Sequence, residues 1–306
     1  MNAAESPGLR AAQAVFAFTS LVIATSCSPA RDADEANVAV PPPPKATASA
    51  TRVAAEDRRA HVELDERALA ACIDKLRDAE DVPSSDPAVA VYRRGREAER
   101  AGRRDDARKA YFEAVQEPKS VLVPHSYYAF GWLFEEDAAQ DPAKLEFAAQ
   151  SYEQVLKHGQ TPLALPARYR LSRIYAQQKE HEKQLSALMA VAREVTMQKA
   201  ACPDQLAAAV RRDIVPAYAE MGDPRKAFNF FRPSFGAMTA ADLSASLAET
   251  YDQQGKREDA QRVTAAALAG LPEPPARLCG LARLLMDARG SEARAELEKA
   301  GRVCGF

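Results

Sequence analysis

The stretch from Leu243 to Pro272 constrains the fold of this chain more than any other part of the sequence. Its apolar residues recur at helical spacing on both sides of Gly255, which predicts two helices joined by a tight turn. Small residues stand where the two helices must approach closely, and large residues fill the gaps between them. The spaced positions are Leu247, Ala248, Tyr251, Gly255, Ala260, Ala267 and Pro272. One such pair cannot bury its apolar face alone, so we expect similar pairs to stack on it.

Related spacings recur along the chain, and together they resemble the tetratricopeptide repeat (TPR). The segments run from Val89 to Pro118, from His125 to His158, from Pro166 to Val195, from Leu206 to Phe231 and, as a terminal helical pair, from Pro274 to Val303. The resemblance covers the chain from Val89 to Phe306. It implies an all-α fold, a right-handed superhelical solenoid of helix-turn-helix TPR-like repeats with a groove along it. A looser α-helical solenoid with related repeats is the alternative.

Several positions depart from a regular repeat. Extra residues near positions 137–141 predict an enlarged turn or a longer first helix in the second repeat. Gln184 stands where a small residue is expected, which predicts looser packing in the third repeat. Pro233 and Gly236 predict an early end to the second helix of the fourth repeat. An apolar stripe within residues 62–79 predicts an N-terminal helix that packs on the first repeat.

Residues 1–26 have the layout of a signal peptide. Arg10 is followed by an uncharged apolar run that is short for a membrane span, and small residues precede Cys27. The segment resembles a bacterial lipoprotein signal, although Ala24 stands where that family prefers leucine. The resemblance implies that Cys27 is acylated, and Ser28 then favours the outer membrane over the inner one. Ordinary secretion with loss of Cys27 and an uncleaved anchor are the alternatives.

Residues 27–61 predict a disordered tether between this signal and the repeat domain at residues 62–306. Pro41 to Pro44 lie among alanine, threonine, serine and charged residues, with no periodic apolar face to bury. A proline run is extended, so the tether would hold the repeats away from a membrane. We therefore expect an exported protein, lipid-anchored to the outer membrane and facing the periplasm, or else soluble in the periplasm or secreted.

The four cysteines after Cys27 are an even number, which in an exported protein suggests disulfides. Cys279 and Cys304 flank a helical hairpin that turns near Gly290, so they fall at the same height and can form a bridge. Cys72 with Cys202 follows by elimination and requires the N-terminal helix to reach the insertion after the third repeat. Buried thiols that act as small apolar residues are the alternative for both pairs.

The sequence holds no recognisable catalytic or metal-binding motif. The four histidines are scattered, and none has a second ligand at metal spacing. The chain also lacks a Cys-x-x-Cys pair, a phosphate-binding glycine loop and a Gly-x-Ser-x-Gly motif. We expect no enzymatic activity, no metal, no cofactor and no small-molecule substrate. The balance of 41 basic and 43 acidic residues argues against nucleic-acid binding.

This layout predicts a non-catalytic TPR adaptor or scaffold of the bacterial cell envelope that binds a protein or peptide partner. Proteins that it resembles include assembly factors for pili, secretins and gliding-motility complexes. The candidate partner-binding residues in the groove are Arg93, Arg96, Tyr128, Arg168 and Arg211. The arginine-rich segment 93–108 is either a solvated face or a docking patch for an acidic peptide or for membrane phosphate groups. The alternative function is a structural spacer or self-assembling scaffold associated with peptidoglycan.

Overall fold

The computed structural model describes residues 66–197, 201–286 and 292–306, and within these ranges it contains helices and no β-strand. The all-α prediction is therefore confirmed for this part of the chain. The predicted signal, Cys27 and the tether at residues 27–61 lie outside the described residues. No helix in the described ranges is both long enough and apolar enough to cross a bilayer.

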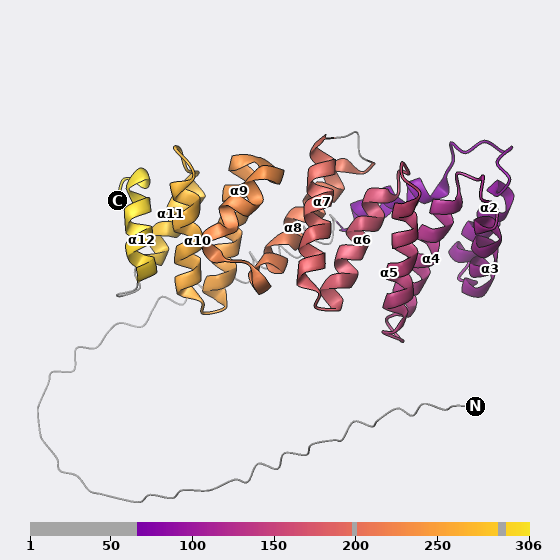
Figure 1. Ribbon diagram of the computed structural model, residues 1–306, viewed down its shortest axis with the longest axis horizontal. Coiled ribbons are helices and arrows are strands. Elements are labelled where there is room, and N and C mark those ends of the chain that lie inside the picture. The colour runs from indigo at the N-terminus through magenta and orange to yellow at the C-terminus, as the bar shows by residue number, and fades with distance from the viewer. Residues whose placement is uncertain (1–65, 198–200, 287–291) are drawn as a thin grey trace, which may run out of the picture. The chain divides into compact units, whose positions relative to one another are not determined.

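The helices follow one another with short connections (Figure 1). After a first helix over residues 66–78 come α2 (Val89–Arg100), α3 (Arg104–Val115), α4 (Val123–Asp137), α5 (Lys144–Lys157), α6 (Ala164–Gln177), α7 (His181–Met197), α8 (Pro203–Met221), η1 (Pro224–Lys226), α9 (Ala227–Gln253), α10 (Arg257–Ala269), α11 (Ala276–Leu285), α12 (Glu292–Gly301) and η2 (Arg302–Cys304).

These helices pack mainly against their neighbours in the sequence. α2 packs on α3, α4 on α5 and α6 on α7, while α8 packs on α7 and on α9, and α9 on α10. α12 packs chiefly on α10. Packing in sequence-adjacent pairs is compatible with the helical repeat that the spacings predict.

Two glycines show why small residues recur in the pattern. A Cβ atom on Gly95 of α2 would lie 2.7 Å from the ring of Tyr111 in α3. A Cβ atom on Gly131 of α4 would lie 2.6 Å from the ring of Tyr152 in α5. Both tyrosines are fully buried, so each glycine lets the aromatic ring of the second helix lie directly on the first helix.

The irregular positions of the sequence correspond to irregularities in the structure. The connection between α4 and α5 is the predicted enlarged turn. Gly236 breaks α9 with φ 77° and ψ 166°, so residues 227–235 and 237–253 are two helices, while Pro233 stays inside the first. Gln184 is buried and lines a hollow of about 370 Å³ between α6, α7 and α8, which fits the predicted loose packing.

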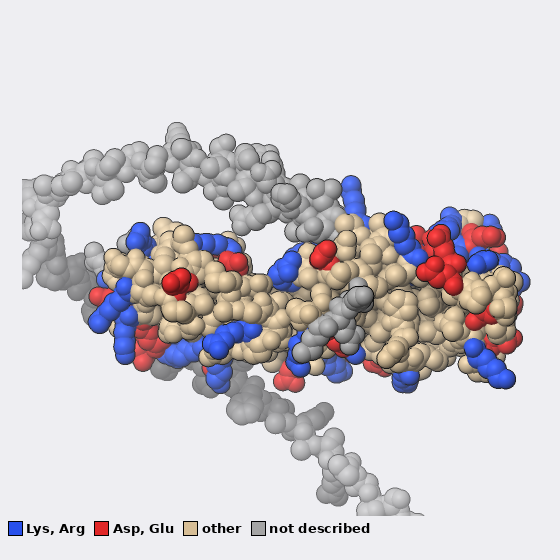
Figure 2. Space-filling view, turned by 90° about the horizontal axis from the view of Figure 1, so that it is seen from above, with Lys and Arg blue, Asp and Glu red and all other residues tan. Residues whose placement is uncertain are grey.

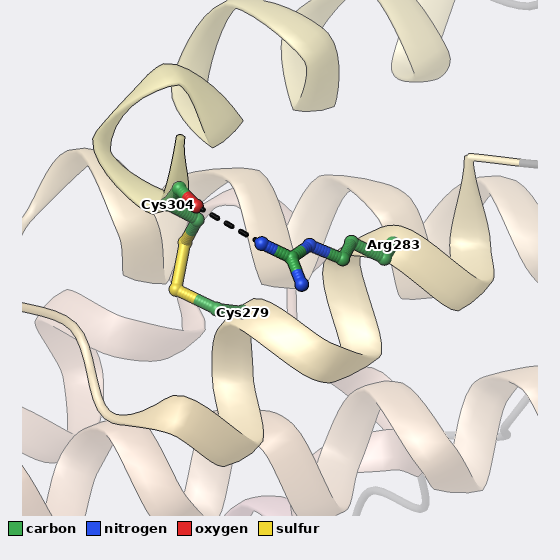
Figure 3. Close-up of a disulfide and its surroundings, with 3 residues drawn as sticks. All are labelled: Cys279, Arg283 and Cys304. Carbon is green, nitrogen blue, oxygen red and sulfur yellow. Dashed lines mark hydrogen bonds between the residues drawn. A yellow bond between two sulfur atoms is a disulfide. The ribbon is translucent and has the colours of Figure 1, made fainter. Parts of the chain in front are cut away.

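Two disulfides join the four cysteines in the predicted pairs. Cys72 is bonded to Cys202 across 130 residues, with 6.0 Å between their Cα atoms. Cys279 is bonded to Cys304 across 25 residues, with 5.6 Å between their Cα atoms. Beside the second bond, the Arg283 guanidinium donates a hydrogen bond of 3.2 Å to the Cys304 carbonyl oxygen (Figure 3). The second bond thus ties the end of the chain to α11.

Candidate partner-binding surface

Helix 66–78 lies against the first helices of several successive pairs. Its Arg77 bonds Glu99 of α2, its Cys72 is bonded to Cys202 at the start of α8, and its Glu66 pairs with Arg212 of α8 at 3.2 Å. Figure 1 shows this indigo helix crossing α4 and α6. The prediction that it packs on the first repeat was therefore too narrow. We call the faces of α2, α4, α6, α8, residues 237–253 of α9 and α11 the first-helix surface.

An apolar stripe holds the helix on this surface. Leu69 and Ile73 are buried in one cluster with Tyr128 of α4 and Tyr169 of α6. Cys72 and Leu76 are partly buried against the same cluster. Residues spaced by three or four lie on one face of a helix, so this set forms a single stripe.

Arg77 continues that stripe with a buried charge. The residue is 2% exposed, and its guanidinium donates hydrogen bonds of 2.6 and 2.7 Å to the two carboxylate oxygens of Glu99. The guanidinium also lies 5.2 Å from the ring centre of Trp132, within the range of a cation–π interaction. Burial alone would lower the pKa of Arg77, but the Glu99 carboxylate outweighs it and raises the pKa.

Carboxylates of the same helix bind a second buried arginine. Arg96 of α2 donates to Asp74 at 2.5 Å and to Asp78 at 2.9 Å. Arg100 also donates to Asp78, at 2.5 and 2.7 Å. Figure 2 shows basic and acidic side chains gathered at the end of the described chain that carries α2 and α3.

Two of the predicted partner-binding residues are corrected by these contacts. Arg96 is buried because the chain's own Asp74 and Asp78 neutralise it, so its charge does not face a partner. Tyr128 is 0% exposed because it packs in the core against Tyr152 and beneath Arg77. Neither side chain is accessible while helix 66–78 is in place.

The other three predicted residues lie apart from one another. Arg168 of α6 is half-buried and forms an ion pair with Glu194 of α7. Arg93 of α2 and Arg211 of α8 are exposed. Among the described residues, the structure gives neither of these two an ion pair. Thus the five candidates do not form one site, and only Arg93 and Arg211 have accessible charges.

Arg211 borders a hollow where the first-helix surface continues beyond Glu66. The hollow has a volume of about 480 Å³ and lies between α8, the second part of α9 and α11. It is lined by Arg211, Arg212, Thr239, Asp242, Leu243, Ser246 and Arg277. Arg212 connects the two regions, because it lines the hollow and also pairs with Glu66. We call this hollow, which helix 66–78 does not cover, the uncovered section of the first-helix surface.

Sequence reasoning missed Asp74, Arg77 and Asp78 as the residues that bind helix 66–78 to α2. A signal for Arg77 was present, since Leu69, Ile73 and Arg77 are spaced by four and an arginine on an apolar stripe predicts a buried ion pair. The partner Glu99 could not be read from the sequence, because it lies 22 residues away.

The described residues contain no group of three or more histidine, cysteine or carboxylate side chains that could hold a metal ion. A comparison with models of protein families finds no match, and a comparison with curated proteins finds none either.

Proposed function

We propose that this protein is a non-catalytic adaptor of the bacterial cell envelope that holds a protein partner on its first-helix surface. In this proposal the helix pairs are TPR-like repeats in a right-handed superhelical solenoid. A lipid on Cys27 anchors the chain to the outer membrane, and residues 27–61 are the tether. The partner belongs to an envelope complex such as a pilus, secretin or motility machine.

The observation that carries the proposal is the mode in which helix 66–78 binds. An amphipathic helix lies on the first-helix surface through an apolar stripe and arginine–carboxylate pairs. Grooves that take helices use this combination of anchors at helical spacing. The uncovered section carries exposed Arg211, which suits a carboxylate side chain of a bound polypeptide, whereas Arg277 there already pairs with Glu249 at 3.0 Å.

The two disulfides support the proposed compartment. Disulfides persist in the periplasm and outside the cell, and they are rare in the reducing cytosol. Both bonds here bridge separate helices of the fold. This agrees with the export signal that the N-terminal sequence resembles.

The proposal is tested by crosslinking in growing cells with a C-terminally tagged chain, comparing the wild type with Cys27→Ala. We expect one envelope protein to be crosslinked to the first-helix surface of the wild type, and to be lost when Cys27→Ala removes the chain from the membrane fraction. If Cys27→Ala leaves the capture of this partner unchanged, the proposed lipid anchor at Cys27 is contradicted. Capture of no other protein would contradict the adaptor itself.

A self-assembling scaffold is the second candidate, and one observation favours it. Phe112 of α3 is 62% exposed and Phe147 of α5 is 47% exposed, both on second helices of their pairs. Exposed large apolar side chains often mark protein contacts. Sedimentation of the wild type and of Phe112→Ser/Phe147→Ser separates the two functions: oligomers that dissociate in the variant support the scaffold.

A further inference from the structure

Helix 66–78 is bound to the repeats in the way that a separate peptide would be. It is followed by a connection over residues 79–88 that begins at Ala79, whose φ is 51°, and then enters α2. Its outer face remains open, with Ala68, Ala71 and Lys75 exposed. Its inner face contacts helices that follow it by 15 to more than 100 residues in the sequence, from Tyr92 to Arg212.

The inner face has a definite recognition pattern. Leu69 and Ile73 supply apolar anchors, and Arg77 is the buried cation that Glu99 accepts. The flanking carboxylates Asp74 and Asp78 bind Arg96 and Arg100. Any amphipathic helix with two apolar anchors, a cation one turn later and these flanking carboxylates would meet the same groups.

The non-covalent hold on this helix combines a short apolar stripe with arginine–carboxylate pairs. Buried arginine–carboxylate pairs lose most of their attraction to the cost of removing both charges from water. Only two apolar side chains of the helix, Leu69 and Ile73, are fully buried. The Cys72–Cys202 bond is therefore the covalent link that fixes the middle of helix 66–78 to the start of α8, in addition to the chain connection through residues 79–88.

We propose that the surface beneath helix 66–78 is an exchangeable helix-binding site whose resident ligand is this helix, released by reduction of Cys72–Cys202. A dithiol reductant supplies two electrons and two protons, two protein thiols form, and the reductant becomes a disulfide. An amphipathic helix of a partner protein, with the pattern described above, then takes the vacated place. This inference rests on the proposed function, because it assigns the chemistry and the regulation of the partner.

The test uses a fluorescent peptide with the sequence of residues 66–78 and serine in place of Cys72. Its binding is measured by anisotropy to the oxidised wild type, to Cys72→Ser/Cys202→Ser and to the matched control Cys279→Ser/Cys304→Ser. We expect saturable binding to Cys72→Ser/Cys202→Ser that is at least about tenfold tighter than to the other two proteins. Asp74→Asn and Asp78→Asn in the peptide should weaken it about tenfold or more.

The inference would be overturned if the peptide bound the three proteins with equal affinity, or if the two Asn substitutions left its affinity unchanged. A second measurement decides the case in which Cys72→Ser/Cys202→Ser does not fold. Hydrogen exchange is followed in Cys279→Ser/Cys304→Ser with and without dithiothreitol, so that only Cys72–Cys202 is reduced. We expect residues 66–78 to exchange at least about tenfold faster after reduction while α4 to α7 do not change. Unchanged exchange in residues 66–78 would overturn the inference.

The two proposals fail separately. Peptide binding in vitro with no partner captured in cells would remove the proposed function and leave the exchangeable site standing. Capture of a partner at the uncovered section with no peptide binding would leave the adaptor standing and remove the exchange.

Discussion

At the scale of single residues, one methyl group tests the close packing of the helix pairs. Gly131→Ala should lower the free energy of unfolding by about 1–3 kcal/mol, because the new Cβ atom would lie 2.6 Å from the buried Tyr152 ring. Gly280→Ala in α11 is the matched control, since no atom lies within 4 Å of its Cβ position. In an exposed helix this change should stabilise by about 0.5–1 kcal/mol. Urea unfolding measures both, and effects of the same sign would contradict the packing.

Arg77 tests whether the charge under helix 66–78 is truly buried. Arg77→Leu removes one of the two arginines that pair with the nearly buried Glu99, so it should cost roughly 1–3 kcal/mol of unfolding free energy. Arg94→Leu breaks an exposed pair with Glu113 and should cost less than about 1 kcal/mol. If chemical denaturation finds the two variants equally destabilised, the Arg77 site is solvated and our description of it is wrong.

His125 gives the fold a pH dependence with a defined sign. Burial lowers the pKa of His125 to about 4, against the small opposing effect of a contact with the Val121 carbonyl oxygen. The unfolded chain therefore binds a proton between about pH 6.5 and pH 4 that the folded chain does not. As the pH decreases through this window, the free energy of unfolding should fall by up to about 1.4 kcal/mol per pH unit.

His125→Gln should remove that part of the pH dependence of the unfolding free energy, as unfolding in denaturant at several pH values can show.

Asp86 affects the stability at lower pH than His125 does. Burial alone would raise the pKa of Asp86, but hydrogen bonds from Ser120 and from the backbone N–H groups of Ala88 and Val121 lower it. Its stabilisation is therefore lost only below about pH 4. If the unfolding free energy of His125→Gln still falls between pH 6.5 and pH 4 as it does in the wild type, the assignment of this pH dependence to His125 is wrong.

The same scale shows where residue-level prediction fails. Arg96 and Tyr128 have the residue types and helical positions of a binding groove, and the sequence alone predicts them as accessible. They are covered because another segment of the chain lies on them. Burial by a distant segment leaves no trace in the local sequence around the buried residue.

At the scale of helices and their connections, the two disulfides should differ in what they contribute. On the chain-entropy model, Cys72–Cys202 closes a loop of 130 residues and stabilises by about 5 kcal/mol, against about 3.5 kcal/mol for the 25-residue loop of Cys279–Cys304. Thermal and urea unfolding of the two double-serine variants compare them. A larger loss from Cys279→Ser/Cys304→Ser would contradict this ranking.

The helix pairs and their breaks could be predicted because they depend on local spacing. Small and large residues a few positions apart set the pairs, Gly236 sets the break in α9, and extra residues set the longer turn after Asp137. The placement of helix 66–78 could not be predicted in the same way. Its apolar stripe shows that it packs, but several first helices offer it similar apolar faces.

At the scale of the whole molecule, the covered and uncovered sections of one surface have different roles in our account. Helix 66–78 and the Cys72–Cys202 bond close the section over α2 to α8. Helix 66–78 does not cover the section near Arg211. The sequence spacing predicts the helix pairs, but it does not show that residues of α8, α9 and α11 come together around the uncovered section, where we propose that a partner binds.

The central claim is that the first-helix surface binds a partner in the envelope, and site-specific photocrosslinking in growing cells tests it most directly. A photoreactive amino acid is placed at Arg211, on the uncovered section, or at Arg193, which is exposed on the second helix α7. Our account predicts that position 211 captures one defined envelope protein and that position 193 does not. Equal capture from both positions, or capture only of further copies of this chain, would contradict it.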